Sequence, residues 1–180
     1  MQRIILALAI VALAAPFAAL AADPPSSGNG ASPAQACKTE QTAMGNDAFK
    51  ALYGTNADKS NAFGKCVSKK ATQRTKSQSN AASACRTEQA DTTFAANHGG
   101  KTFDQFYGTG KNGKDAFGKC VSSKAKAAND AADANVLNAV KQCKAERAND
   151  PAAFKSKYGK NGNKANAMGK CVSQTAKAKA

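Results

Sequence analysis

Six cysteines divide this chain into three equivalent pairs, and a chain with that pattern is expected to fold as small cross-linked units. The second cysteine of each pair lies in one pattern, F-x3-Y-G-x6-[ND]-A-[FM]-G-K-C-V-S, and the first begins a C-x2-E sequence upstream of it. Agreement in register over 20 residues in three copies does not arise by chance, so this is a repeat protein. The three copies are Phe49–Ser68, Phe103–Ser122 and Phe154–Ser173. The cysteines are Cys37, Cys66, Cys85, Cys120, Cys143 and Cys171.

The first 21 residues are typical of a secretory signal peptide. Arg3 precedes an apolar run from Ile4 to Ala15, and small residues lead to a predicted cleavage site after Ala21. The run is too short to span a bilayer as a stable helix, although a retained membrane anchor is the alternative. We therefore expect a secreted, periplasmic or envelope protein with no transmembrane segment in the mature chain. Export to an oxidising compartment favours disulfides over free thiols.

Large apolar residues are too scarce to hold such a chain together. Alanine accounts for 41 of the 180 residues, and only 19 Phe, Tyr, Leu, Val and Met residues follow Ala21. Burying about six of them per repeat, at about 1.5–3 kcal/mol each, barely offsets the entropy of ordering each unit. Each cysteine pair closes a loop of about 30 residues and contributes roughly 3–4 kcal/mol in the chain-entropy model. The disulfides are therefore expected to be essential staples.

The predicted fold is all-α, with three tandem disulfide-stapled helical units joined by longer helices. The C-x2-E segment has good helix formers, and helices are also expected at the F-x3-Y segment and the A-[FM]-G-K-C-V-S segment. Neither glycine nor proline occurs between Cys66 and Cys85 or between Cys120 and Cys143, so a continuous helix is expected there. Such helices would separate these cysteines by about 28 and 35 Å, far beyond disulfide reach. Pairing within repeats remains: Cys37–Cys66, Cys85–Cys120 and Cys143–Cys171.

The predicted organisation is a signal peptide (1–21), a flexible linker rich in Pro, Gly and Ser (22–33), and three helical repeats (34–76, 77–128 and 129–180). The second repeat is longer because of an insertion, Asn97–Gly100, which we place in a tolerated loop.

Several residues are expected to end or begin helices. Asp150 and Asp47 are predicted N-caps, with Pro151 at the first helical position. The glycine after each tyrosine is expected to adopt a left-handed conformation at a helix end. The polar residue of each [ND]-A pair is expected to cap the third helix of its repeat. These positions are Gly54, Gly108 and Gly159, and Asn61, Asp115 and Asn166.

A glycine also recurs inside the third helix of every repeat, at Gly64, Gly118 and Gly169. Glycine weakens a helix, so its recurrence predicts close approach of another backbone or ring. A simply tolerated glycine is the alternative.

No catalytic or metal-binding pattern accompanies the repeats. Zinc sites use C-x2-C or paired histidines, and the chain has neither. His98, the only histidine, is predicted to be exposed on the inserted loop. The recurring glutamates Glu40, Glu88 and Glu146 are expected to pair with Lys65, Lys119 and Lys170, and the tyrosines to pack in the core rather than bind ligands. No enzyme activity and no cofactor are predicted.

The net charge is +14, and +13 without the signal peptide. The charge can serve solubility alone, or it can attract an anionic partner: acidic glycans, nucleic acid or anionic lipid. The candidate polyanion contacts are the basic residues after the first motif, which are expected to face water: Lys69, Lys70, Arg74 and Lys76. A solvated helix face explains them equally well.

The element from Tyr53 to Ser68 resembles that of uncharacterised bacterial secreted proteins with one or more cysteine-paired helical units. The resemblance covers most of residues 36–173, and Met168 in place of Phe is one departure. It implies the architecture and no catalytic residue. We expect an exported basic helical-repeat protein with a structural or binding role. The alternative is an enzyme or enzyme inhibitor with its site in the variable loops between helices.

Overall fold

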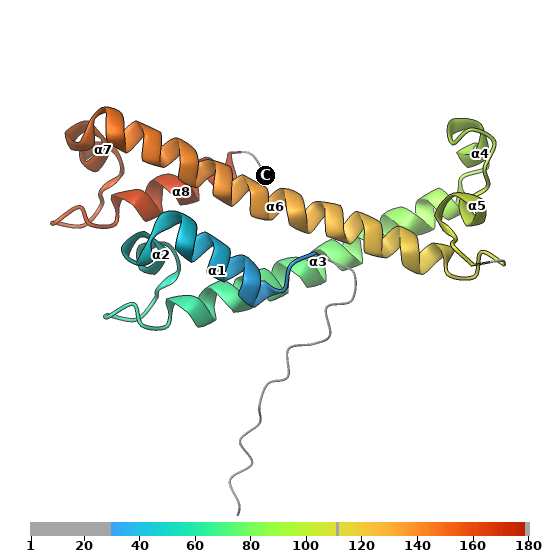
Figure 1. Cartoon of the computed structure of the whole chain (residues 1–180), viewed down its shortest axis with the longest axis horizontal. Coiled ribbons are helices and arrows are strands. Elements are labelled where there is room, and N and C mark those ends of the chain that lie inside the picture. The colour runs from blue at the N-terminus through green and yellow to red at the C-terminus, as the bar shows by residue number, and fades with distance from the viewer. Residues whose placement is uncertain (1–29, 111, 179–180) are drawn as a thin grey trace, which may run out of the picture.

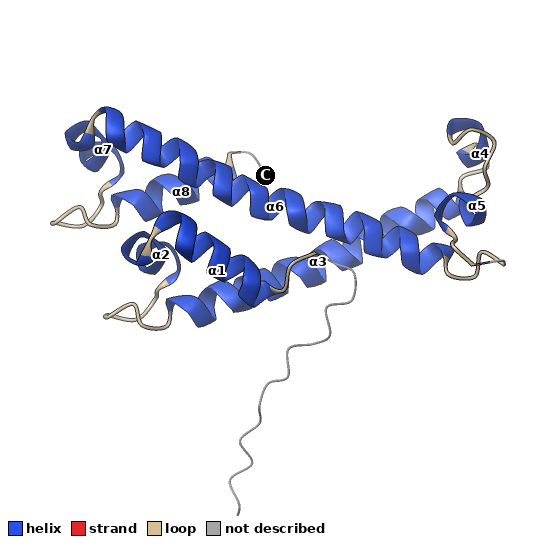
Figure 2. Ribbon diagram, in the orientation of Figure 1, coloured by secondary structure: helices blue, strands red, loops and turns tan. Residues whose placement is uncertain are grey.

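The computed structural model describes residues 30–110 and 112–178, which form eight α-helices and no strand (Figure 2). The predicted all-α fold is therefore confirmed. The predicted signal peptide and most of the linker lie outside the described residues. The helices are α1 (Pro33–Met44), α2 (Asn46–Tyr53), α3 (Ala62–Ala90), α4 (Phe94–Asn97), α5 (Phe103–Tyr107), α6 (Ala116–Asn149), α7 (Pro151–Tyr158) and α8 (Ala167–Lys177).

Two long helices join the repeats, as predicted from the absence of helix breakers. The α3 helix has 29 residues and α6 has 34. Each carries the second cysteine of one repeat near its start and the first cysteine of the next near its end. The predicted repeat boundaries, after residues 76 and 128, therefore fall inside continuous helices rather than in linkers.

All three predicted disulfides are present. Cys37–Cys66, Cys85–Cys120 and Cys143–Cys171 have Cα–Cα distances of 5.9, 6.0 and 6.0 Å, and the described residues include no free cysteine. Five of the six cysteines are fully buried and Cys171 is 1% exposed. Each bond therefore lies at the centre of its unit. We call these units 1, 2 and 3: α1, α2 and the start of α3; the end of α3, α4, α5 and the start of α6; and the end of α6, α7 and α8.

The units do not form a linear array. Figure 1 shows units 1 and 3 side by side at one end of the molecule and unit 2 alone at the other end. The long helices α3 and α6 pack against each other between these ends, α2 packs on α8, and α1 packs on α6. The chain is thus a hairpin of units, in which unit 2 is the bend and unit 3 returns to unit 1.

The described residues have two hydrophobic cores, in accordance with this arrangement. The larger core joins units 1 and 3 and includes Phe49, Phe154, Val140 and Val172. The smaller one belongs to unit 2 alone and centres on Phe94, Phe103 and the Cys85–Cys120 bond. Unit 2 consequently depends more on its disulfide than the joined units depend on theirs.

Alanine allows α3 and α6 to pack closely. Ala81 of α3 and Ala125 and Ala139 of α6 are 5%, 0% and 0% exposed. A small side chain allows two helix axes to approach, and dispersion between the backbones then replaces the contacts of large apolar side chains. The alanine-rich composition is therefore part of the packing.

Helix starts follow the sequence only in part. The Asp150 carboxylate accepts hydrogen bonds from the N–H groups of Ala152 and Ala153 at 3.1 and 2.9 Å, with Pro151 at the first helical position, as predicted. The prediction for Asp47 is wrong, because α2 begins at Asn46 and Asp47 lies within its first turn.

The loop before each third helix corrects two further predictions. The recurring Asn or Asp side chain does not cap its helix but accepts the backbone N–H six residues earlier, which closes the loop. These contacts, 3.0–3.1 Å long, are Asn61 with Thr55, Asp115 with Thr109 and Asn166 with Lys160. The glycines after the tyrosines are extended, with φ near −70°, and the left-handed residues come five positions later: Lys59, Gly113 and Lys164.

The three recurring glycines of the third helices differ in their surroundings. A Cβ added to Gly169 would lie 2.9 Å from the backbone nitrogen of Leu52 and 3.0 Å from the carbonyl carbon of Ala51, so α8 and α2 touch at this point. An added Cβ at Gly64 or Gly118 would have no neighbour within 4 Å. The predicted close approach is confirmed at Gly169 alone.

Alanine at these three positions should therefore have opposite effects. Gly64→Ala and Gly118→Ala should raise the free energy of unfolding by up to about 1 kcal/mol, because alanine favours the helix and meets nothing. Gly169→Ala should lower it, because α8 and α2 must separate. Thermal unfolding of the three variants measures this difference. Equal shifts in all three would contradict the packing of α8 on α2.

Loss of the unit 2 disulfide should loosen unit 2 alone. The double substitution Cys85→Ala and Cys120→Ala removes about 3–4 kcal/mol of cross-link stabilisation from the smaller core. We expect rapid hydrogen exchange in α4 and α5 with continued protection in α1 and α8. Cys143→Ala with Cys171→Ala is the matched control and should expose residues in both units 1 and 3. Uniform loss of protection in both variants would show that the two cores are not separate.

Candidate functional site

A hydrogen bond between a glutamate and a tyrosine recurs in every unit. The Tyr53 hydroxyl donates to Glu40 at 2.5 Å, Tyr107 to Glu88 at 2.8 Å and Tyr158 to Glu146 at 2.9 Å. The predicted partners of these glutamates, Lys65, Lys119 and Lys170, are wrong. The glutamate of the C-x2-E sequence instead accepts a hydrogen bond from the tyrosine of F-x3-Y-G, and this contact joins α1 to α2, α3 to α5 and α6 to α7.

The cation beside each glutamate depends on the unit. In units 1 and 2 it is the lysine four residues after the second cysteine: Lys70 contacts Glu40 at 2.5 Å and Lys124 contacts Glu88 at 2.7 Å. The equivalent residue of unit 3 is Thr175, which lies 3.9 Å from the sulfur of Cys171. There, Lys157 pairs with Glu146 at 2.7 Å.

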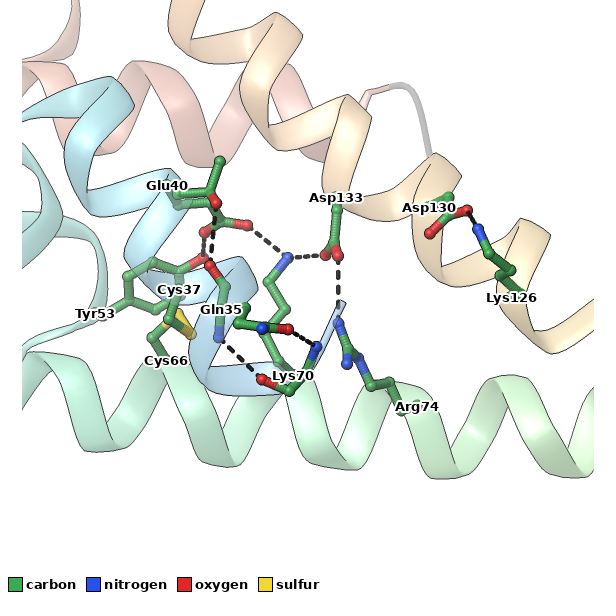
Figure 3. A network of polar contacts seen from close by, with 12 residues as sticks. Gln35, Cys37, Glu40, Tyr53, Cys66, Lys70, Arg74, Lys126, Asp130 and Asp133 are labelled. Atoms are coloured by element: carbon green, nitrogen blue, oxygen red, sulfur yellow. Dashed lines mark hydrogen bonds and ion pairs between the residues drawn. A yellow bond between two sulfur atoms is a disulfide. The ribbon is translucent and has the colours of Figure 1, made fainter. Parts of the chain in front are cut away.

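The unit 1 version is a buried network that crosses to α6 (Figure 3). Glu40 is 1% exposed and Lys70 is 3% exposed. The Lys70 ammonium also contacts Asp133 of α6 at 2.5 Å, and Arg74 contacts the other oxygen of Asp133 at 3.4 Å. Opposite charges within ion-pair distance compensate for their removal from water. The network therefore ties unit 1 to the helix that leads into unit 3.

The raised pKa of the Tyr53 phenol favours a structural role for this network. Burial, together with the charge and the hydrogen-bond acceptor of Glu40, raises the pKa of Tyr53 well above its ordinary range. The phenol keeps its proton and remains a donor to Glu40. A phenol that keeps its proton near neutral pH does not act as a general base there.

Unit 2 has a more open copy of the same contact. Burial of Glu88 acts to raise its pKa, but hydrogen bonds from Lys124 and Tyr107 outweigh burial and lower the pKa overall. A carboxyl with a lowered folded-state pKa stabilises the fold above its ordinary pKa, and this contribution is lost as pH falls through the lowered value. Acid should therefore weaken the Glu88 contact.

The four candidate polyanion contacts are not equivalent. The prediction that they face water is wrong for Lys70, which is buried, and for Arg74, which is 15% exposed and paired with Asp133. Lys69 and Lys76 are exposed, and the Lys69 ammonium lies 5.5 Å from the centre of the Tyr53 ring. Only Lys69 and Lys76 remain available to a partner.

A groove of about 1010 Å³ lies between units 1 and 3. Its walls come from the end of α1, from α2 and its following loop, and from the loop and helix start of unit 3. Four basic and two acidic residues line it: Lys50, Lys59, Arg147 and Lys170, and Asp47 and Asp58. No ion pair joins any of these six to another described residue within 4 Å. The groove exists only because unit 3 returns to unit 1.

From the sequence, Lys170 and Asp47 are predicted to have other roles, and none of the six is predicted to line a groove. Lys50, Lys59, Arg147 and Lys170 come from four separate segments, and no local pattern connects them. A signal for Lys70 was present, however, since a lysine follows the second cysteine by four residues in two of the three copies. Recurrence alone does not identify an internal contact, because Lys65, Lys119 and Lys170 recur in all three copies and are exposed.

A smaller cavity of about 340 Å³ lies where α3 and α6 meet α2 and α8. Its lining is mainly apolar, from Leu52, Val136 and Val172, with Lys69 and Lys177 among the polar residues. It adjoins the buried network through Tyr53 and Lys70.

His98 of the inserted segment corrects another prediction. The His98 ring is half-buried, stacks on Phe94 at 3.8 Å between ring centroids, and its Nδ1 lies 2.8 Å from the Phe94 carbonyl oxygen. Only Asn97 of the insertion belongs to α4, the short helix that contributes Phe94 to the core of unit 2, and residues 98–100 form the turn that follows it, as predicted. The described residues contain no cluster of three or more His, Cys, Asp or Glu side chains placed to hold a metal ion. None of the described helices combines the length and hydropathy that a bilayer crossing requires.

No protein-family model, curated protein or solved structure matches the chain. The resemblance to secreted cysteine-paired proteins therefore stays a prediction.

Removal of the buried lysine should be far more damaging than removal of its exposed counterpart. Lys70→Met leaves the Glu40 carboxylate buried without its cation and should cost about 3–5 kcal/mol of unfolding free energy. Lys124→Met is the matched control and should cost at most about 1 kcal/mol, because the ion pair of Lys124 is partly exposed. Chemical denaturation monitored by circular dichroism measures both. Similar losses in the two variants would contradict a special role for the unit 1 network.

Proposed function

We propose that this protein is an exported, non-enzymatic binding protein that holds polyanions in the groove between units 1 and 3. The observation that carries the proposal is the position of Lys50, Lys59, Arg147 and Lys170, which line one open groove without ion-pair partners among the described residues. Cations in a groove raise the local concentration of an anionic polymer and contact its charges in succession.

The charge distribution supports this end of the molecule. Residues 34–76 carry a formal +5 and residues 129–180 a formal +6, whereas residues 77–128 carry +3. Units 1 and 3 lie together at one end (Figure 1), and their sequences carry most of the excess charge. Asp47 and Asp58 reduce the net positive charge of the groove itself. Lysines around the groove add to its attraction for a polyanion.

Among polyanions, linear polymers such as acidic glycans or nucleic acid suit the groove better than a lipid surface. Helices that lie on membranes present a broad apolar face beside their cations. Only Phe63 and Phe106 are exposed large apolar side chains among the described residues, and they lie in different units. No array of stacking aromatic side chains lines the groove, so we expect little sequence preference.

Export is the part of the proposal that the disulfides support. Three disulfides are typical of proteins that fold outside the reducing cytosol. A secreted, periplasmic or envelope protein would meet acidic glycans, extracellular nucleic acid or anionic polymers of the cell surface. The proposal includes cleavage of the signal peptide near Ala21.

Binding of heparin or single-stranded DNA tests the function. The affinity should fall by orders of magnitude between about 50 and 200 mM salt if six or more contacts form, because binding releases counterions. Arg147→Gln with Lys170→Gln should weaken binding strongly. Lys69→Gln with Lys76→Gln is the matched control, since it removes the same charge from a surface outside the groove.

Three results would count against this proposal. Equal weakening of polyanion binding by the two double variants would show that the groove is not the binding site. No binding at low salt would leave the charge as a solubility device. Tight binding of one partner that ignores salt would favour an enzyme or enzyme inhibitor with its site in the loops between helices.

A further inference from the structure

The contact between α8 and α2 shows how two units of this protein dock. Unit 3 contributes Met168 and Gly169 from the start of its third helix, and unit 1 contributes Ala51 and Leu52 from its second helix. Met168 is 5% exposed and Leu52 packs against the same core. The absence of a side chain at Gly169 allows the two backbones to touch.

The repeat pattern places equivalent surfaces on the other units. Phe63 and Gly64 of unit 1 occupy the motif positions of Met168 and Gly169. Phe106 of unit 2 occupies the position of Leu52, one residue before the motif tyrosine. Phe63 is 39% exposed and Phe106 is 46% exposed, and they are the only exposed large apolar side chains among the described residues.

The remaining equivalent positions are less suited to docking. In unit 3, Lys157 replaces Leu52 and pairs with Glu146. In unit 2, Phe117 replaces Met168 but is less exposed than Phe63, and the guanidinium of Arg86 lies 5.8 Å from its ring centre. One apolar surface of each kind is therefore uncovered: Phe63 with Gly64, and the α5 surface around Phe106.

We propose that a second copy of this chain covers these surfaces, so that the start of α3 in one molecule docks on α5 of another and repeats the contact of α8 with α2. The two surfaces lie at opposite ends of one molecule (Figure 1) and cannot meet within it. Each copy has one surface of each kind, so the contact is heterologous: two copies close as an antiparallel pair, or successive copies extend head to tail.

The contact should be weak and should strengthen with salt. A single helix-on-helix contact is smaller than a standard stable interface. The copies also repel one another, because each carries a net charge of +14 before processing. Salt screens this repulsion, whereas salt weakens polyanion binding, so the two activities can be separated.

Analytical ultracentrifugation of the purified mature protein tests the proposal. The average mass should rise with protein concentration up to about 1 mM in about 0.5 M salt. Phe63→Lys and Phe106→Lys should each remain monomeric. An equimolar mixture of the two should associate again, because one variant retains the intact α5 surface and the other retains Phe63 and Gly64.

Gly64→Ala provides a variant that does not depend on disrupting the fold. Its added Cβ meets nothing in the monomer but would meet a docked backbone, as a Cβ at Gly169 would. It should therefore reduce association at least tenfold with unchanged or higher thermal stability. Gly118→Ala is the matched control and should associate like the original chain.

A protein that stays monomeric at every concentration and salt would overturn the proposal. So would a mixture of Phe63→Lys and Phe106→Lys that fails to associate while Gly64→Ala associates normally. Association lost in Phe106→Lys but retained in Phe63→Lys would show instead that unit 2 pairs with itself.

Discussion

The fold of each unit depends on one disulfide, which joins the helix of its first cysteine to the helix of its second cysteine. With few large apolar side chains, no unit buries enough surface to offset the entropy of ordering its helices. Each buried cysteine pair restricts the unfolded chain and holds two helices about 6 Å apart at their Cα atoms. The glutamate–tyrosine hydrogen bond then attaches the helix that carries the tyrosine to the helix that carries the first cysteine. One covalent and one polar contact thus replace most of a conventional core.

Three nearly identical sequences nevertheless have three different surroundings. Unit 3 docks on unit 1, so Met168 is buried while Phe63, its counterpart, is exposed. Asp133 of α6 lies beside Lys70. The lysine of unit 1 is therefore part of a buried network, whereas the equivalent Lys124 of unit 2 has a partly exposed ion pair. Unit 2, at the bend, keeps a small core to which α4 contributes Phe94. The differences between copies therefore follow from their places in the hairpin.

The positive charge of the chain serves two purposes. Part of it is internal: Lys70 and Arg74 compensate for buried carboxylates and tie α3 to α6. The rest includes Lys50, Lys59, Arg147 and Lys170, which line the groove between units 1 and 3. Lys70 and Arg74 of the basic stretch have ion-pair partners, whereas the four cations of the groove have none among the described residues, where Lys59 instead donates a hydrogen bond to the Gly54 carbonyl oxygen. This difference is why the proposed function concerns the groove and not the basic stretch after the first motif.

The sequence by itself determined the helices other than α4, the disulfide pairing and the continuity of α3 and α6, because these follow from local propensity, from helix breakers and from the short reach of a disulfide. It misplaced the roles of Asn61, Gly54 and His98, because a capping residue and a loop residue differ only in which backbone group lies nearby. The tertiary structure alone decided that unit 3 returns to unit 1 and that Lys70 is buried. It also decided that Arg147 and Lys170 line the same groove as Lys50. These features depend on how α3 and α6 pack against each other and on contacts between residues far apart in the chain, such as Gly169 of α8 against the backbone of Leu52.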